Sequence, residues 1–390
     1  MDRSIRVKTI DLVIFALFIA VFKIRLIPQV IQQITKIFLL LFVALFLNKK
    51  IKFKYYMNFI FLMSLFMIVS SVFGYADGTT KLVNIANGIL YVICINCIWL
   101  VCKYCKEKNC FQLLIRDLFC IDSIYCVLSL ISMFVFGHSA NGTEIMYIFG
   151  SKFMTSYYFI FWITLFRIRN QEKIDNDRVY KFYYFLLVVF VLYICKWLYC
   201  TTAMVATLFL FIEQFIPERL KVILFNRASI ITSILLAGMI PICINTVLAN
   251  KNVQHIIVDI LHKSSNITGR RVVFVNLIGN VIKKRPWFGY GYGNMAVHQL
   301  INQNIDNAQN GLMEQIVNYG VIGGILFCIM IFMLMPSAYK GNKQNALYAA
   351  LYVMIICSIV EISYNFIFYF IIILIANFND NSNRVYGNKI

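Results

Sequence analysis

The sequence predicts an all-α membrane protein, a polytopic transmembrane helical bundle of about 12 spans with one large extracytoplasmic loop containing short helices. Of its 390 residues 61% are hydrophobic and only 14% are charged, whereas soluble domains are about 45–50% apolar and about 25% charged. Uncharged runs such as 82–101 and 230–249 are long enough to cross a hydrocarbon core of about 30 Å. Lys23 and Arg25 follow the first apolar stretch, so we expect a retained span rather than a cleaved signal peptide.

Polar segments between the apolar runs define the order of the spans. The expected ranges are approximately 10–27, 31–47, 56–73, 82–101, 113–136, 153–166, 182–197, 201–216, 230–249, 314–335, 346–361 and 364–378. Placing both termini in the cytoplasm puts most of the 36 basic residues there, as the positive-inside rule requires. The chain then divides into residues 1–249 with spans one to nine, residues 250–313 as the extracytoplasmic loop, and residues 314–390 with the last three spans and a cytoplasmic tail.

Neither the net charge nor the cysteines indicate another class of protein. The formal charge of +19 falls mostly in short segments between spans, so membrane topology explains it without nucleic acid. Nearly all of the 12 cysteines fall in apolar spans or on the cytoplasmic side, where thiols act as small apolar groups. Cys94 and Cys97 loosely mimic zinc spacing but fall inside an expected span, so we expect no metal and no cofactor.

The expected outer loop breaks the positive-inside rule. Against Asp259 and Asp306 it carries seven basic residues, namely Lys251, Lys263, Arg270, Arg271, Lys283, Lys284 and Arg285. Basic charge is costly to move across the bilayer during insertion. An anionic substrate at the outer membrane surface would explain the basic charge of this loop.

Two short helices are expected in this loop, over 253–261 and 271–282, the second with one broad apolar face lying on the membrane surface. Residues 264–268 supply candidate N-caps, which places Arg270 and Arg271 in a first helical turn. Unpaired N–H groups, the positive end of the helix dipole and two guanidinium groups together favour a phosphate site. The alternative is that these arginines contact lipid phosphates.

The segment 285–294 follows, in which Pro286 ends the preceding helix and alternating glycines permit tight turns. Its aromatic residues, Trp287 and Tyr290 among them, suit either a membrane interface or stacking against a sugar ring. The glycine spacing is not a dinucleotide fingerprint, because no strand precedes it.

A dense polar set then marks the entrance of the tenth span, with Asp306, Gln309, Asn310 and Glu314. Ionisable groups at the edge of a span are functional candidates. For Glu314 plain interfacial solvation is the alternative.

Three elements together, 268–270, 285–291 and 309–314 with 319–323, resemble the O-antigen ligase/polymerase superfamily of bacterial membrane glycosyltransferases. The match covers about sixty residues, and the remaining chain matches in span count and layout. The resemblance implies a multi-pass protein of the bacterial plasma (inner) membrane that transfers a glycan from polyprenyl diphosphate to an acceptor hydroxyl at the outer face. It also implies that no metal or nucleotide sugar is needed, and that membrane lipid, a flippase and a chain-length regulator are partners.

By the same resemblance, Arg270 binds and neutralises the diphosphate leaving group. Ligases of the family typically have a histidine where this chain has Gln309, which cannot take a proton; this favours a repeat-unit polymerase that makes O-antigen or capsule. A family stretch beginning the eighth span appears as 200–203 without its arginine, and Lys196 lies one turn away as a substitute.

A base is expected to activate the acceptor hydroxyl, and the candidates are Glu314, Asp306 and His138. Glu314 ranks first because it is closest to the motif over 309–314. The expected catalytic residues are thus Arg270, Glu314, Gln309 and Asn310, and the expected substrate-binding residues are Arg271, Arg285, Lys196, Tyr290, Trp287 and His138. Two alternatives stay open: a ligase-type glycan transferase, and a flippase or transporter for the same lipid-linked oligosaccharide. Flippases usually carry ionisable residues deep in several helices and lack one large outer loop.

Overall fold

The described part of the chain is mostly helical. The computed structural model describes residues 3–22, 27–48, 59–74, 81–136, 147–255, 258–259, 270–301, 305–336, 339 and 344–378. No strand occurs among these residues. The predicted all-α class is confirmed.

Each of the twelve apolar ranges expected from the sequence coincides with a helix. These are α1 (Arg3–Val21), α2 (Gln29–Asn48), α3 (Phe59–Phe73), α4 (Lys81–Glu107), α5 (Phe111–Phe136), α6 (Lys152–Asn176), α7 (Arg178–Trp197), α8 (Thr201–Ile212), α10 (Arg227–Ala249), α14 (Gly311–Leu334), α15 (Asn345–Ser358) and α16 (Phe366–Asn377). Between α8 and α10 lie a 3-10 turn, η2 (Glu213–Phe215), and the short α9 (Glu218–Leu224). The largest differences from the expected ends are at α6, which continues ten residues past its predicted end at 166, and at α1, which begins seven residues before 10.

Five of the described helices are long and apolar enough to cross a membrane, namely α4, α5, α7, α10 and α14. This indicates a membrane protein. The apolar parts of α1, α2, α3, α8, α15 and α16 are shorter, so the count of twelve spans stays a prediction. Large apolar side chains such as Phe38, Phe134 and Leu236 are more than half exposed, as expected for a surface that contacts lipid.

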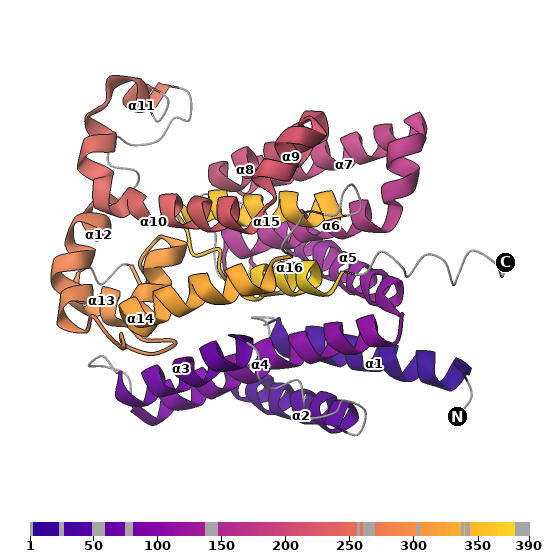
Figure 1. The fold of residues 1–390 in the computed structure, drawn as a ribbon, viewed down its shortest axis with the longest axis horizontal. Helices are drawn as coiled ribbons and strands as arrows, with labels where there is room; N and C mark the ends of the chain where they lie inside the picture. Colours follow the sequence, from indigo (N-terminus) through magenta and orange to yellow (C-terminus); the bar gives the residue numbers. More distant parts are fainter. Residues whose placement is uncertain are drawn as a thin grey trace.

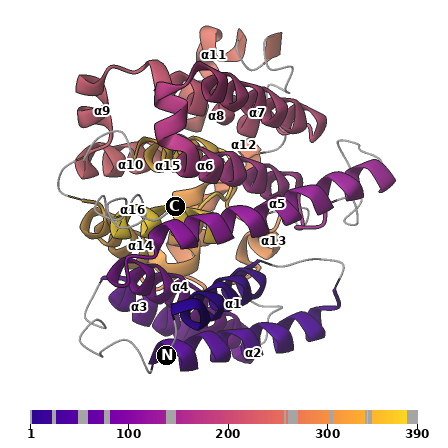
Figure 2. The same cartoon turned by 90° about the vertical axis from the view of Figure 1, so that its right-hand side faces the viewer.

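The helices form three groups in the bundle (Figures 1 and 2). Helices α1–α4 lie on one side, α7–α10 lie on the other, and α14–α16 pass between them. The middle group is the most buried: every side chain from Ile367 to Ile375 is at most 2% exposed. The linker between α15 and α16 is therefore anchored by two helices of the core.

The segment between α10 and α14 forms a cap at one end of the bundle, opposite the N-terminal end of α1 (Figure 1). Its elements are α11 (Lys251–His255), α12 (Arg270–Asn276), a π-helical stretch η4 (Leu277–Val281), a 3-10 turn η5 (Ile282–Lys284) and α13 (Ala296–Leu300). The helix expected over 271–282 is confirmed, although its hydrogen-bond pattern changes along its length. The helix expected over 253–261 is seen only as α11, and most of its remainder lies outside the described residues.

The cap has a small hydrophobic core of its own. Val273, Leu277 and Val281 are buried against α10 and α14, where Ile244 and Val317 contribute to the same cluster. Three further apolar residues of this stretch, Val272, Val275 and Ile278, are exposed. The single broad apolar face expected from the sequence is therefore wrong: most of the apolar residues pack onto the protein, and these three face outward.

Candidate functional site

The first residue of α12, Arg270, joins the cap to the linker between α15 and α16. Its Nε donates a hydrogen bond to the carbonyl oxygen of Val360 at 2.8 Å, and one of its Nη groups pairs with the carboxylate of Glu361. The two side chains are only 15% and 8% exposed. Removing one partner of a buried pair costs about 3–5 kcal/mol, so this contact fixes the start of α12 against the core of the bundle.

Asn310 holds the same linker from α14. It is the N-cap of that helix: its Oδ1 accepts a hydrogen bond from the Met313 backbone N–H at 3.1 Å. Its Nδ2 donates to the carbonyl oxygens of Ala237, on α10, and Ile359, each at 3.0 Å. Because Asn310 binds Ile359 and Arg270 binds the next carbonyl, these two predicted residues lie on consecutive peptide groups of one linker.

We expect Asn310→Ala to lower the free energy of unfolding by about 3 kcal/mol. The substitution removes an N-cap, worth about 1 kcal/mol, and leaves two buried carbonyl groups unsatisfied, each at about 1–3 kcal/mol. The thermal midpoint of the detergent-solubilised protein measures this change. Asn280→Ala is the control, since Asn280 is exposed and its loss should change stability by less than about 0.5 kcal/mol. Equal midpoints for the two variants would show that Asn310 is not a structural anchor.

Glu361 lies among cations in a buried setting. Burial raises the pKa of its carboxyl to about 7, although Arg270 and Lys152 both lower it. Lys152 is the first residue of α6, and Cys200, just before α8, is within electrostatic range of both Glu361 and Lys152. The starts of α6, α8 and α12 therefore meet at one carboxyl group that can change its charge near neutral pH.

The turn before α14 is held from both sides by side chains. Gln309 has a positive φ of 52°, which a non-glycine residue rarely adopts. Its backbone N–H and its Nε2 donate to the Asn307 Oδ1 at 3.0 and 2.8 Å. Glu314 accepts hydrogen bonds from the Ala308 N–H at 2.9 Å and from the Asn318 Nδ2 at 3.2 Å. One carboxylate oxygen of Glu314 therefore anchors this turn, and the other is bound by Asn318 within α14.

The glycine-rich segment after Arg285 lies along a break in α14. The helix is interrupted at Gly320, with φ 68° and ψ −178°. At the break, the loop and the helix form backbone hydrogen bonds with each other. The Tyr290 N–H donates to the Val317 carbonyl at 2.9 Å, and the Val321 N–H donates to the Pro286 carbonyl at 2.7 Å. A Cβ at Gly320 would lie 2.1 Å from the Trp287 carbonyl oxygen. Close backbone packing thus explains this glycine.

Side chains of α3 and α4 hold the same loop from the other side. Ser70 donates to the Asn318 carbonyl at 2.8 Å and contacts that of Phe288, while Asn84 donates to the Tyr290 carbonyl at 2.9 Å. Hydrogen bonds therefore join α3, α4, the glycine-rich loop and α14. The position of the cap depends on these bonds.

Three residues expected to bind substrate on this loop differ in their surroundings. Tyr290 is 4% exposed, its hydroxyl donates to the Val281 carbonyl at 3.1 Å, and burial raises its pKa. Arg285 donates to the Phe73 carbonyl at 3.0 Å and lies 5.5 Å from the Tyr290 ring centroid. Trp287 is 62% exposed. Burial of Tyr290 favours a packing role over stacking on a sugar, and Trp287 keeps its ring accessible.

The remaining predicted residues lie apart from the Arg270–Glu361 pair. Arg271 is exposed, and its Nε donates to the Asn245 Oδ1 at 3.2 Å. Lys196 is exposed in the last turn of α7, which packs against α6 and α8, and no contact joins it to Arg270 in the described part of the chain. Lys152, and not Lys196, is the cation that lies beside Glu361.

Two further predicted residues belong to the expected outer loops. His138 lies outside the described residues. Asp306 is exposed and contacts the His298 Nδ1 at 3.0 Å.

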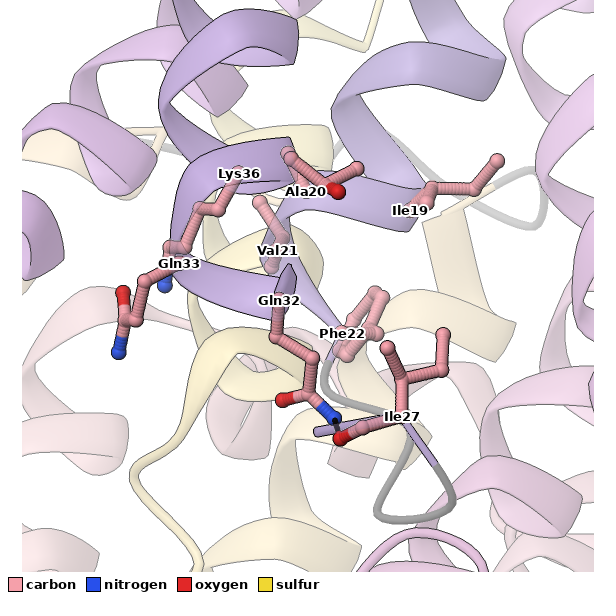
Figure 3. Close-up of a pocket in the computed structure, with 9 residues that line it drawn as sticks. Ile19, Ala20, Val21, Phe22, Ile27, Gln32, Gln33 and Lys36 are labelled. Atoms are coloured by element: carbon pink, nitrogen blue, oxygen red, sulfur yellow. Dashed lines mark hydrogen bonds between the residues drawn. The ribbon is translucent and has the colours of Figure 1, made fainter. Parts of the chain in front are cut away.

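A pocket of about 90 Å³ opens between α1 and α2 (Figure 3). One wall is apolar, with Ile19, Val21 and Phe22, and the other carries polar residues of α2 that include Gln33 and Lys36. The Lys36 Nζ lies 5.5 Å from the ring centroid of Phe366, at the start of α16. An apolar wall beside a cation suits an amphipathic ligand.

Glu361 is the residue of this site that the sequence did not single out. A signal was present, because Glu361 interrupts an apolar run between two expected spans, and ionisable residues there are functional candidates. Its partner was not visible, since Arg270 precedes it by 91 positions and the contact depends on how the helices pack.

No family model, no curated protein and no solved structure matches this chain. Fold and site alone define its class, a helical membrane protein with a largely buried arginine–carboxyl pair where a cap meets the core of the bundle.

Proposed function

We propose that this protein is a membrane glycosyltransferase, a polysaccharide repeat-unit polymerase that transfers glycan from polyprenyl diphosphate to a sugar hydroxyl at the outer face of the bacterial plasma membrane. The observation that carries the proposal is the pairing of Arg270, at the start of a helix in the cap, with a carboxyl group of near-neutral pKa. The motifs of the cap that resemble the ligase/polymerase superfamily support the same assignment.

In this proposal the diphosphate replaces Glu361 as the partner of Arg270. Guanidinium groups bind phosphate with paired donors, and a fixed cation stabilises the negative charge that develops on the leaving group. Lys152 adds a second cation close by. Lys152 also stays beside Glu361 and favours its ionised form, which a base requires.

Glu361, once it has released Arg270, is then placed to act as the base that takes the proton of the acceptor hydroxyl. A pKa near the working pH suits this role. We prefer Glu361 to Glu314, because both oxygens of Glu314 already accept hydrogen bonds from the protein, one from the turn before α14 and one from within α14. The pocket between α1 and α2 offers an apolar wall for the polyprenyl tail.

The pH dependence should differ between the wild-type protein and Glu361→Gln. The folded-state pKa of Glu361 is raised from 4.5 to about 7, so the stability that its protonated form contributes is present below pH 4.5 and is lost as the pH rises through 7. We expect the wild-type thermal midpoint to fall relative to that of Glu361→Gln between pH 5 and pH 8, by the equivalent of up to about 3 kcal/mol. Thermal unfolding of both proteins over this range measures the difference, and parallel curves would contradict it.

The turnover of lipid-linked repeat units in isolated membranes gives the matching functional test. Glu361→Gln should lower turnover by about 10²-fold or more if it removes a general base, and wild-type turnover should rise with pH between 6 and 8. Glu314→Gln is the paired control, which should affect stability more than the pH profile. The opposite ranking would return the base role to Glu314.

Glycan gels of cells lacking the protein separate the proposal from its alternatives. Loss of a polymerase leaves single repeat units, loss of a ligase leaves unattached polymer, and loss of a flippase leaves no outer glycan. Only the first pattern agrees with the proposal.

A further inference from the structure

A second polar site lies at the other end of α6. There a cavity of about 230 Å³ is lined by Arg167, Asp175, Lys181, Gln214, Glu218 and Lys221, among others. Arg167 follows Lys152 by fifteen positions on α6, which places it about 22 Å along the helix from the site of Arg270 and Glu361. The cavity is therefore separate from the candidate active site.

The carboxylates around this cavity already have partners. Asp175 accepts two hydrogen bonds from the Gln171 Nε2, each at 3.0 Å, and Glu218 pairs with the Lys221 Nζ at 3.0 Å. Glu213, which is fully buried, forms ion pairs with Arg167 and, at 3.2 Å, with Lys221. Glu213 and Glu218 are thus paired with cations of the protein, and Asp175 has a neutral hydrogen-bond donor.

By contrast, two hydrogen-bond donors of the residues that line the cavity have no acceptor in the described part of the protein. The Arg167 side chain is only 3% exposed, and its buried Nε has no hydrogen-bond partner among the described residues. The same holds for the Nε2 of Gln214. A buried donor without an acceptor costs about 1–3 kcal/mol, and such groups in a native structure call for an explanation. A ligand rich in acceptor oxygens provides one.

We propose that this cavity binds the phosphate group of a small anionic ligand, with Arg167, Lys181 and Lys221 as the cations and Gln214 as a neutral donor. Arginine and lysine together are the residues that proteins use for phosphate. Among the charged residues that line the cavity, these three cations face two carboxylates. The phosphate belongs either to a soluble molecule or to a lipid headgroup, since the helices around the cavity also border the membrane.

Binding of pyrophosphate to the full-length protein in nanodiscs of neutral phosphatidylcholine tests this inference. We expect saturable binding with a rise in the thermal midpoint. Lys181→Gln should weaken it about tenfold through loss of one charged contact, and because Lys181 is exposed its replacement should not impair folding. Gln214→Ala should also weaken binding without lowering the midpoint in the absence of pyrophosphate, because its buried Nε2 has no protein partner to lose.

Lys173→Gln is the matched control, since Lys173 is a nearby exposed lysine that contacts the Tyr180 hydroxyl and does not line the cavity. A second arm replaces part of the neutral lipid by phosphatidylglycerol. A midpoint rise with this lipid alone that Lys181→Gln removes and Lys173→Gln does not would assign the phosphate to a headgroup. Absence of both effects, or equal weakening by Lys173→Gln and Lys181→Gln, would overturn the inference.

Discussion

An Arg270→Ala variant is expected to insert into the membrane and fold, and to make no polymer. The substitution removes the cation that in our proposal binds the diphosphate. Loss of a single fixed donor from a charge-stabilising site commonly costs about 10²–10³ in rate, and Arg270 supplies several donors. Polymer length on glycan gels, with the amount of membrane-inserted protein measured in parallel, gives the readout.

Part of that loss has a structural cause, because Arg270→Ala leaves Glu361 buried without its ion pair. The double variant Arg270→Ala with Glu361→Gln tests the structural cause. It removes the unpaired carboxyl, so we expect the thermal midpoint to recover toward that of the wild-type protein, while polymer remains absent because the cation and the proposed base are both gone. Recovery of polymer together with stability would overturn the catalytic roles of both residues.

Arg270→Lys gives a graded version of the same test. Lysine keeps the positive charge but loses the fork of donors, and with it the bond from Nε to the Val360 carbonyl. We expect intermediate activity. Normal long chains from Arg270→Ala itself would end the proposal for this residue.

Most of the helical architecture could be predicted because it depends on information within each segment. Runs of apolar residues bounded by charge show where helices lie, and each of the twelve expected ranges coincides with a helix. The position of Arg270 at the start of α12 could also be predicted, from the run of capping residues before it. Whether all twelve helices span a membrane, and on which side the cap lies, stays a prediction.

The site itself depends on packing between distant segments and was predicted less well. Tyr290 was expected to face a sugar, but the loop that carries it lies against α14, and the ring is buried in the cap. Lys196 was chosen for its closeness in sequence to the start of α8, whereas Lys152 of α6 lies beside Glu361. The burial of Tyr290 and the position of Lys152 cannot be predicted from the residues next to them in the sequence, since both depend on how distant segments pack.

The glycines of the cap also show that local sequence predicts turns better than it predicts contacts between distant segments. Their spacing suggested tight turns, which is correct for Gly289, Gly291 and Gly293, all with positive φ. The sequence did not show that a fourth glycine, Gly320 in the middle of a helix, belongs to the same feature. That glycine breaks α14 where the loop packs against it, and the two segments then share their backbone hydrogen bonds.

Gly320→Ala is expected to destabilise the protein more than any other single substitution discussed. With φ 68° and ψ −178°, Gly320 lies in a region of backbone conformation essentially limited to glycine, which costs other residues about 1–3 kcal/mol. An added Cβ would also lie 2.1 Å from the Trp287 carbonyl oxygen and 2.6 Å from the Phe288 nitrogen. Both are backbone atoms, so no side chain can turn aside to make room.

The loop must then move away from α14, and the hydrogen bonds across the break are lost. The Tyr290 N–H, the Gly291 N–H and the Pro286 carbonyl give up their partners in α14, and each buried group left unsatisfied costs about 1–3 kcal/mol. The expected total exceeds about 4 kcal/mol, a loss reached only by severe substitutions. Detergent-solubilised Gly320→Ala should show a strongly lowered thermal midpoint or aggregate on size-exclusion chromatography.

Gly279→Ala makes the matched control, since it places the same methyl group on a glycine of the same cap. A Cβ at Gly279 has no neighbouring atom within 4 Å, and its φ is not in the left-handed region. We expect an unchanged or slightly raised midpoint there, because alanine restricts the unfolded chain by about 0.4–1 kcal/mol. The cap positions Arg270, so Gly320→Ala should also abolish polymer while Gly279→Ala should not. A Gly320→Ala protein as stable as Gly279→Ala would show that the loop does not hold the cap against α14.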